Sequence, residues 1–378
     1  MDDGTSGCVD FRCTDILVEV LQRLPPNTRR LCRLVSRRWR DAVDKRTATD
    51  LRSRAKTLLV TRNGRSVLDD SWRVKPLMAC RQEDLAVVGT CNGLICFCDD
   101  TKPGGSIVLV NPDKGERLVL PPLPCADILS QCRPWWHEAY GFAHNQSTGR
   151  YTVVHIPCCF SGIWEFHTVQ VFTLGGTSWR DVATPAVGGV GVACLRKAGV
   201  VSVDGATYWV AEATERIMSF DLEKERVTSV QPLPVPLPTR SGSSFRLAEV
   251  HGRLGMAIFN DSAKLARTDV WVLESARGEQ RWRLWYSVEV VKVRHYPYGV
   301  GTPCQWMTLP HFAHGDHVLA HGGGILYRHE PNGTRKKSRY GMVQIGERNT
   351  GKIAATGRVE QAFAYVETKE PLDIYRLW

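Results

Sequence analysis

Two periodicities divide the chain. Between residues 14 and 46, apolar residues recur every three or four positions, which is the spacing of one face of an α-helix. After Leu58 the apolar residues instead alternate with polar ones or form short runs rich in valine and aromatic residues. Glycine, asparagine and aspartate separate these runs, as in β-hairpins. The pattern therefore predicts a small helical segment followed by a large β domain.

The helical segment is expected to contain three short helices. Thr14 can cap the first helix, the pair Pro25 and Pro26 ends it, and Ser36 can cap a later one. Three short helices bury too little apolar surface among themselves to be stable alone, so another surface is expected to cover them. The apolar positions of this segment are Ile16, Leu17, Val20, Leu21, Leu24, Leu31, Leu34, Val35, Trp39, Ala42 and Val43.

The β region contains a repeat. Hairpin phrases such as "TLLVTRNGRS" and "VLVNPDKGERLVL" recur at intervals of 49 to 61 residues. One position in each phrase marks the repeat: Val60, Val110, Val171, Phe220, Trp271 and Leu326. A period near 50 residues with about four strands in each unit is the signature of kelch-like propeller blades. We predict an all-β propeller of about six blades, or seven if the C-terminal "QAFAYVETKEPLDIYRLW" adds a unit.

The charge is local. Of the net charge of +10, a surplus of seven comes from residues 10–60, where 13 basic side chains face 6 acidic ones. The 13 cysteines form no regular framework and the first residues lack the apolar run of a signal peptide, so free thiols in the cytoplasm and/or nucleus are expected. No stretch approaches the roughly 18 apolar residues that span a bilayer, so no membrane partner is expected.

The most basic stretch, "TRRLCRLVSRRWRDAV", has three interpretations: a protein interface, a nucleic-acid site or a solvated face. Its six arginines share their helices with an apolar stripe that has to be covered. Nucleic-acid readers need stacking or base-reading partners among the basic residues, and Trp39 is the single aromatic residue here. We favour a protein interface whose arginines form a basic rim that steers association, and nucleic acid is the less favoured partner. The arginines are Arg29, Arg30, Arg33, Arg37, Arg38 and Arg40.

At this point the residues resemble a known family. The phrase "DILVEVLQRLPPNTRRLCRLVSRRWRDAVD" resembles an F-box, and "CNGLICF", "VNPDKGERLVLPPLP" and "AYGFAHNQSTGRYTVV" resemble the strands of the propeller-type domain that follows it in many plant F-box proteins. The likeness runs from about residue 12 to residue 350. Members usually open the motif with Leu-Pro, where this chain has Arg12 and Cys13.

The resemblance implies a non-catalytic subunit of a Skp–cullin–F-box (SCF) ubiquitin ligase, without a cofactor. An F-box at 10–50 would bind the Skp adaptor and, through it, the cullin–RING scaffold, while a propeller at 56–378 would recruit an unknown protein substrate. The F-box positions would divide between its own core and the adaptor interface, and the residues alone leave that division open. The positions that match are Ile16, Leu17, Val20, Leu21, Leu24, Pro25, Leu31, Leu34, Val35 and Trp39.

Candidate chemistry is sparse. The cysteines in "CNGLICFC" and "HIPCCF" lack the paired spacing of a zinc site, so we interpret them as buried structural thiols. The histidines of "HFAHGDHVLAHGGG" would align on a helix, but the glycines favour loop and strand. An oxidase-type propeller enzyme is the remaining alternative, although no convergent set of acids, bases or metal ligands supports it.

Aromatic residues suggest two roles. Five tryptophans are expected to pack between blades: Trp179, Trp209, Trp271, Trp282 and Trp285. Aromatic-rich loops often provide the strongest contacts of an interface. The phrases "CRPWWHEAY" and "RHYPYGVGTPCQW" are interpreted as such loops, with candidate substrate contacts at Trp135, Trp136, His137, His295, Tyr296 and Tyr298.

Overall fold

The fold is described from a computed structural model. None of the helices it describes is long and apolar enough to cross a membrane. The described residues are 10–24, 32, 35–43, 56–61, 64–69, 73–77, 85–99, 104–124, 136–159, 168–184, 193–195, 198–211, 216–230, 233–234, 243–250, 252–261, 265–276, 279–291, 311–314, 317–322, 325–329, 343–344, 359–368 and 370–375.

The described strands form six four-stranded sheets. The first sheet has the order β24 (Val359–Tyr365), β1 (Lys56–Thr61), β2 (Gly64–Leu68) and β3 (Val74–Pro76). The second runs β4 (Ala86–Cys91), β5 (Leu94–Cys98), β6 (Ile107–Asn111) and β7 (Glu116–Val119). The third runs β8 (Trp136–Asn145), β9 (Arg150–Cys159), β10 (Thr168–Thr173) and β11 (Arg180–Ala183).

The other three sheets repeat this order. The fourth runs β12 (Val201–Val203), β13 (Ala206–Val210), β14 (Ile217–Asp221) and β15 (Arg226–Ser229). The fifth runs β16 (Ser243–Val250), β17 (Arg253–Asp261), β18 (Leu265–Ala276) and β19 (Glu279–Val291). The sixth runs β20 (His311–His314), β21 (His317–Gly322), β22 (Ile325–His329) and β23 (Val343–Gln344).

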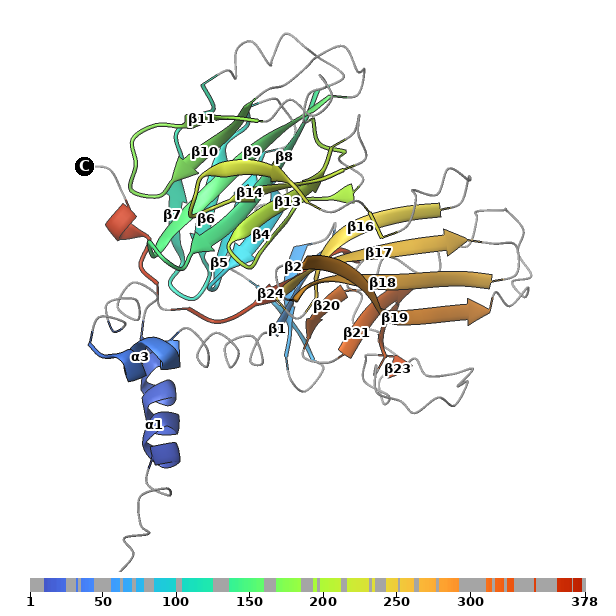
Figure 1. The fold of residues 1–378 in the computed structure, drawn as a ribbon, viewed down its shortest axis with the longest axis horizontal. Coiled ribbons are helices and arrows are strands. Elements are labelled where there is room, and N and C mark those ends of the chain that lie inside the picture. Colours follow the sequence, from blue (N-terminus) through green and yellow to red (C-terminus); the bar gives the residue numbers. More distant parts are fainter. Residues whose placement is uncertain are drawn as a thin grey trace, which may run out of the picture.

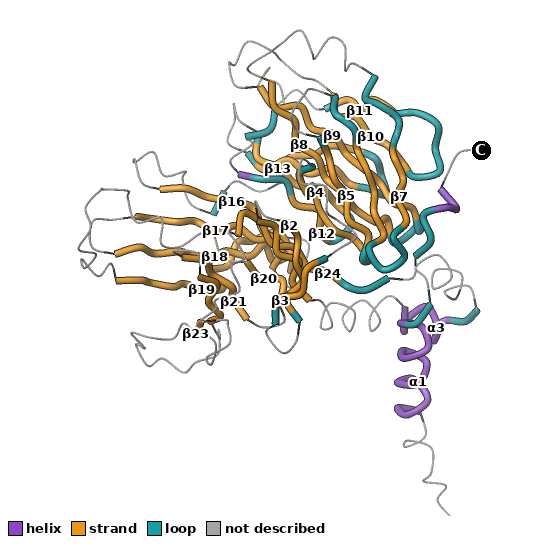
Figure 2. Tube along the Cα trace, turned by 180° about the vertical axis from the view of Figure 1, so that it is seen from behind, coloured by secondary structure: helices purple, strands orange, loops and turns teal. Residues whose placement is uncertain are grey.

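The contacts between sheets close into a ring, so the protein is an all-β propeller. Figures 1 and 2 show the sheets together and the helices α1 and α3 apart from them at one end of the molecule. The first-named strand of each sheet contacts that of the next sheet, and the series returns from β20 to β24. Strand β24 pairs antiparallel with β1, with Phe363 opposite Leu58. The C-terminal segment therefore completes the first sheet, and the alternative that it forms a seventh unit is wrong. The reason is that β1 is a largely buried strand that pairs with β2 along one edge only, so its other edge is open to β24.

Side-chain hydrogen bonds form the turns of the hairpins. The Oδ1 atoms of Asn111, Asn145 and Asp221 each accept hydrogen bonds from the two backbone N–H groups that lie two and three residues later. These are Asx turns, in which the side-chain oxygen acts as the acceptor that a backbone carbonyl provides in other turns, and this stabilises the turn conformation. The same kind of turn thus recurs in three consecutive sheets.

Tryptophans fill the interfaces between sheets, as predicted in most cases. Trp179 is buried and donates from Nε1 to the carbonyl oxygen of Pro121, 2.9 Å away in the second sheet. Trp209 is fully buried, and Trp271 and Trp282 are partly buried between the fourth and fifth sheets. The prediction is wrong for Trp285, which is 36% exposed. This residue is the extra residue of a β-bulge on the outer strand β19, which breaks the regular alternation of faces there.

The cysteines of β5 are buried on both faces of the strand, because every residue from Leu94 to Cys98 is buried. This confirms the expectation of buried thiols for Cys96 and Cys98. Cys91, at the end of β4, is half-buried as a residue. The loss of solvent around its thiol, with a smaller contribution from the negative charge of Glu249, raises the pKa of Cys91 to about 12.

A thiol with this pKa is almost entirely protonated at pH 8.5, and the thiolate is the reactive species. We therefore predict that iodoacetamide leaves Cys91 unmodified in the folded protein at pH 8.5 and modifies it after denaturation in urea. Peptide mass spectrometry measures both states. Rapid modification of Cys91 in the folded protein would contradict the burial of this thiol.

Candidate docking surface

Two helices are described in the N-terminal segment, α1 (Asp10–Gln22) and α3 (Arg37–Asp41). Ser36 caps α3 as predicted, because its side chain accepts a hydrogen bond from the backbone N–H of Trp39 at 3.3 Å. The prediction that Thr14 caps the first helix is wrong, since α1 begins at Asp10. No glycine or proline interrupts residues 10–13, so the helix extends past this threonine. Thr14 Oγ1 instead accepts a hydrogen bond from Arg38 Nη2 at 2.9 Å, which links α1 to α3.

The helix expected between α1 and α3 lies outside the described residues. Six residues that were predicted to bind the adaptor or to form the basic rim also lie outside the described residues: Pro25, Leu31, Leu34, Arg29, Arg30 and Arg33. The first helix ends before the proline pair, where the N–H groups of Arg23 and Leu24 bond back to Val20 and Leu21 over three residues.

The apolar residues of the helices divide into two groups. Val18, Leu21 and Ala42 are buried and form the centre of a small core. Around them pack five partly buried residues: Leu17, Leu24, Cys32, Trp39 and Val43. This core holds α1 against α3 and explains why so short a segment keeps its helices together.

The second group faces solvent. Ile16 is 66% exposed, Val20 is 45% exposed and Val35 is 63% exposed. Ile16 and Val20 are four residues apart and therefore lie one above the other on the same face of α1. We call these three side chains the exposed apolar set. Branched aliphatic residues exposed to this degree, beside a core that already has its own members, indicate a surface for a partner.

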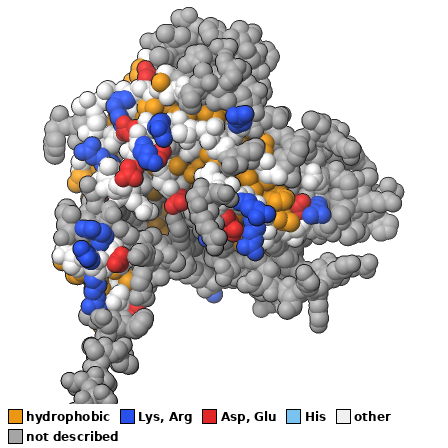
Figure 3. Space-filling view, in the orientation of Figure 1, with side chains coloured by type: hydrophobic (Ala, Val, Ile, Leu, Met, Phe, Trp, Pro, Cys, Tyr) orange, Lys and Arg blue, Asp and Glu red, His pale blue; other side chains and the backbone are white. Residues whose placement is uncertain are grey.

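Basic side chains are exposed on the same helical segment. Arg37, Arg38 and Arg40 are exposed on α3, and Figure 3 shows Lys and Arg side chains gathered over the helical segment. On α1, Arg23 forms an ion pair of 3.2 Å with Glu19. The segment thus exposes both apolar and arginine side chains, a combination that is common at protein interfaces.

The candidate substrate residues are mostly outside the described part of the chain. Trp135, His295, Tyr296 and Tyr298 belong to this group. Trp136 and His137 were expected in a loop, and this is wrong, since both begin β8. Their backbones pair with Cys159 and Cys158 of β9. Strand β9 has ten residues, several of them β-branched, and its pairing with β8 continues into the segment that was expected to be a loop.

A groove of about 430 Å³ lies on the outer rim, between β7 and the turn that follows β10. Phe172 and Tyr375 line it, and Tyr375 ends the short helix η4 (Asp373–Tyr375). Among the described residues, no group of three or more His, Cys, Asp or Glu side chains is placed to hold a metal ion.

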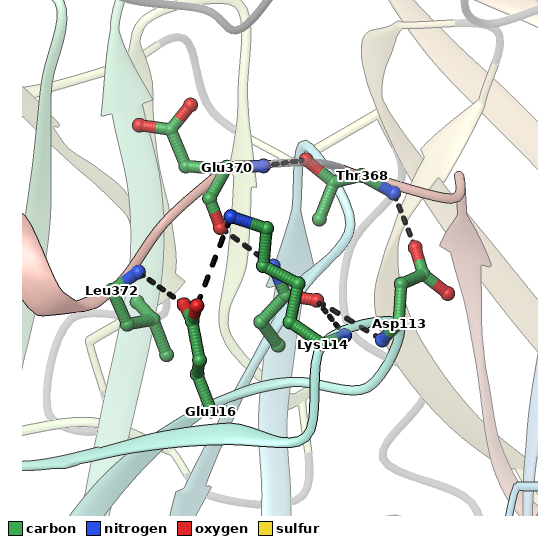
Figure 4. A network of polar contacts seen from close by, with 7 residues as sticks. Asp113, Lys114, Glu116, Thr368, Glu370 and Leu372 are labelled. Atoms are coloured by element: carbon green, nitrogen blue, oxygen red, sulfur yellow. Dashed lines mark hydrogen bonds and ion pairs between the residues drawn. The ribbon is translucent and has the colours of Figure 1, made fainter.

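Sequence reasoning missed a set of polar residues that hold the C-terminal segment (Figure 4). Asp113 accepts hydrogen bonds from the hydroxyl of Tyr365 at 3.1 Å and from the backbone N–H of Thr368. Glu116 Oε2 accepts from the N–H of Leu372 at 2.7 Å, and Asn111 Nδ2 donates to the carbonyl oxygen of Glu370. More than 250 residues separate the partners, so no local pattern in the sequence could have indicated them.

Comparison with known proteins identifies both parts of the chain. Residues 13–48 match the model of the F-box domain, and residues 56–303 match that of the F-box associated beta propeller domain. The relatives include the F-box protein At3g07870 of Arabidopsis thaliana, which is 24% identical over 75% of this chain and 74% of its own length. The F-box/LRR-repeat protein At2g43260 of Arabidopsis thaliana is 26% identical over 73% of this chain and 67% of its own length.

A solved structure with some likeness is the GH74 xyloglucanase from Xanthomonas campestris, with a TM-score of 0.36 and 11% identity over 77% of this chain and 52% of that one. The match to the propeller model is much stronger than such a likeness, because it covers well over half of the chain at a defined place after the F-box. The protein belongs to the F-box associated beta propeller family, with an F-box at its N-terminus followed by the propeller.

Proposed function

We propose that this protein is the substrate-recognition subunit of an SCF-type ubiquitin ligase. The observation that carries the proposal is the exposed apolar set of Ile16, Val20 and Val35 on an F-box whose own core is already formed by Val18 and Leu21. In the proposal, the exposed set binds a Skp-family adaptor, which connects the chain to a cullin–RING scaffold.

The energetics favour apolar contact over charge as the source of affinity. Burying an aliphatic side chain is worth about 1.5–3 kcal/mol. An exposed ion pair is worth about 1 kcal/mol or less. The three members of the exposed apolar set would therefore outweigh the arginines of α3, which would act mainly on the rate of association.

The propeller would recruit the protein to be ubiquitinated, with each four-stranded sheet acting as one blade of a rigid support. The groove beside β7 is a described surface that would suit a segment of such a protein. The chain would carry out no catalysis of its own. It would act in the cytoplasm and/or nucleus, where the ligase components and reduced thiols are found together.

Removal of residues 1–50 tests the proposal. We expect the whole chain to recover a Skp-family adaptor and a cullin in affinity purification, and the truncated chain to recover neither. Far-UV circular dichroism of the truncated chain should retain the β signal, because no core residue of the helices is shared with the described sheets. Equal recovery of the adaptor by both chains would exclude the F-box as the docking site.

A further inference from the structure

Arg246 occupies an unusual place in the ring. It lies on β16, the innermost strand of the fifth sheet, and its side chain reaches the neighbouring fourth sheet. A Cβ atom placed on Gly199, just before β12, would lie 3.3 Å from Arg246 Nε and 3.6 Å from its Cγ. The arginine side chain therefore reaches across the inner end of the interface between the fourth and fifth sheets.

This guanidinium has no partner among the described residues. It forms no hydrogen bond and no ion pair with any of them. Partial burial lowers the pKa of Arg246, and no acidic side chain among the described residues acts against that shift. Arg65, a buried arginine, is different, because it donates to the carbonyl oxygen of Leu85 and lies over the ring of Phe97.

Gly199 provides the room that Arg246 uses. Its φ of +74° is a conformation that residues with a Cβ rarely adopt, and its missing side chain leaves space for Nε. Glu249 is the acidic residue on the same strand, three positions further on. Successive side chains of a strand alternate between faces, so Glu249 and Arg246 leave β16 on opposite sides.

Arg246 is partly buried, and a partly desolvated charge without a counter-ion destabilises a folded protein unless something else compensates it. Such groups concentrate at binding and catalytic sites. A planar guanidinium can donate two parallel hydrogen bonds to a carboxylate or a phosphate, so either of these anions is the natural partner for an unpaired arginine. The fold thus holds one cation in a defined position with its donors unused by the described residues.

We propose that Arg246 binds an anionic group, a carboxylate or a phosphate, presented by the recruited protein at the inner end of the interface between the fourth and fifth sheets. The proposal that Arg246 binds an anion rests on the proposed function only in naming the recruited protein as the source of that anion. The site itself is a property of the propeller and can be tested without an adaptor or a substrate.

The test uses thermal unfolding of the full chain in sodium phosphate, sodium acetate and sodium chloride at equal ionic strength and pH. Ligand that binds the folded state raises the unfolding midpoint. Phosphate also raises the midpoint of folded proteins without binding them, because it is excluded from the protein surface, so each response is compared with that of Arg246→Gln. We expect phosphate, relative to chloride, to raise the midpoint of the unmodified chain by about 1–2 °C more than that of Arg246→Gln. The control Arg281→Gln changes an exposed arginine of β19 and should respond like the unmodified chain. An excess over Arg246→Gln in acetate as well as phosphate would assign the site to carboxylates too, and an excess in phosphate alone would assign it to phosphorylated side chains.

A second variant separates binding from a structural role. Arg246→Met keeps much of the length of the side chain and removes the charge, so in chloride its unfolding midpoint should equal or exceed that of the unmodified chain. A lower midpoint in chloride, together with the same response to phosphate as the unmodified chain, would show that the arginine is structural. An equal phosphate response in the unmodified chain and Arg246→Gln would also overturn the proposal. Neither result depends on whether the F-box binds an adaptor, so the two proposals fail separately.

Discussion

Replacing Ile16 with aspartate is expected to abolish adaptor binding while the chain stays folded. The side chain is 66% exposed, so a carboxylate there is solvated in the free protein. Binding would force that carboxylate into an apolar contact, at a cost of several kcal/mol. A loss of about 3 kcal/mol corresponds to a decrease in affinity of more than a hundredfold. Isothermal titration with a purified Skp-family adaptor measures the affinity, and thermal unfolding measures the stability.

Two controls make this result specific. Leu21→Asp should also abolish binding, but by unfolding the helices, because Leu21 is fully buried in their core. Arg37→Ala should weaken binding by a few-fold at most, since it removes one exposed charge from the periphery. The account is wrong if Ile16→Asp binds normally and Arg37→Ala does not, because charge would then carry the function of this segment.

Deletion of residues 359–378 is expected to prevent the propeller from folding. It removes β24, the inner strand of the first sheet, and with it Phe363 and the buried Tyr365. It also removes the segment that Asp113 and Glu116 hold. An open ring would leave β1 without its partner strand and expose the core beside it. Loss of the cooperative unfolding transition in urea would report this outcome.

A single substitution tests the same contact without deleting a strand. Asp113→Ala removes the acceptor of two hydrogen bonds to the C-terminal segment, from Tyr365 and from the backbone of Thr368. Hydrogen bonds to a charged acceptor are worth about 1.5–3 kcal/mol each. Asp113 is exposed to solvent, which weakens each bond, so we expect a total loss of about 2–4 kcal/mol. Glu223→Ala is the matched control, because Glu223 holds the equivalent place in the β14–β15 turn. Equal effects of the two substitutions would show that the C-terminal segment does not hold the ring closed.

The repeat in the sequence predicted much of the propeller. Five of the six marked positions lie on the third strand of their sheets: Val110, Val171, Phe220, Trp271 and Leu326. Val60 instead lies on the second strand of the first sheet, because the inner strand of that sheet comes from the C-terminal end. A period read along the chain cannot show that its first and last units share one sheet, since the pairing joins residues about 300 positions apart.

The docking surface was predicted less completely. Helical periodicity placed Ile16 and Leu21 in the same apolar stripe, but one is exposed and the other is fully buried. They are five residues apart, and five residues rotate about 140° around a helix, so only packing against α3 decides which face becomes the core. Arg246 and Asp113 carry no local signal at all, because their environments are made by neighbouring sheets or by the distant C-terminal segment.

Hydrogen–deuterium exchange of the full chain, with and without a purified Skp-family adaptor, tests the central claim most directly. If the F-box connects the propeller to the ligase, the adaptor should slow exchange within residues 10–43 and leave the strands between residues 56 and 375 unchanged. Slower exchange confined to the propeller strands, with no change in residues 10–43, would contradict the account.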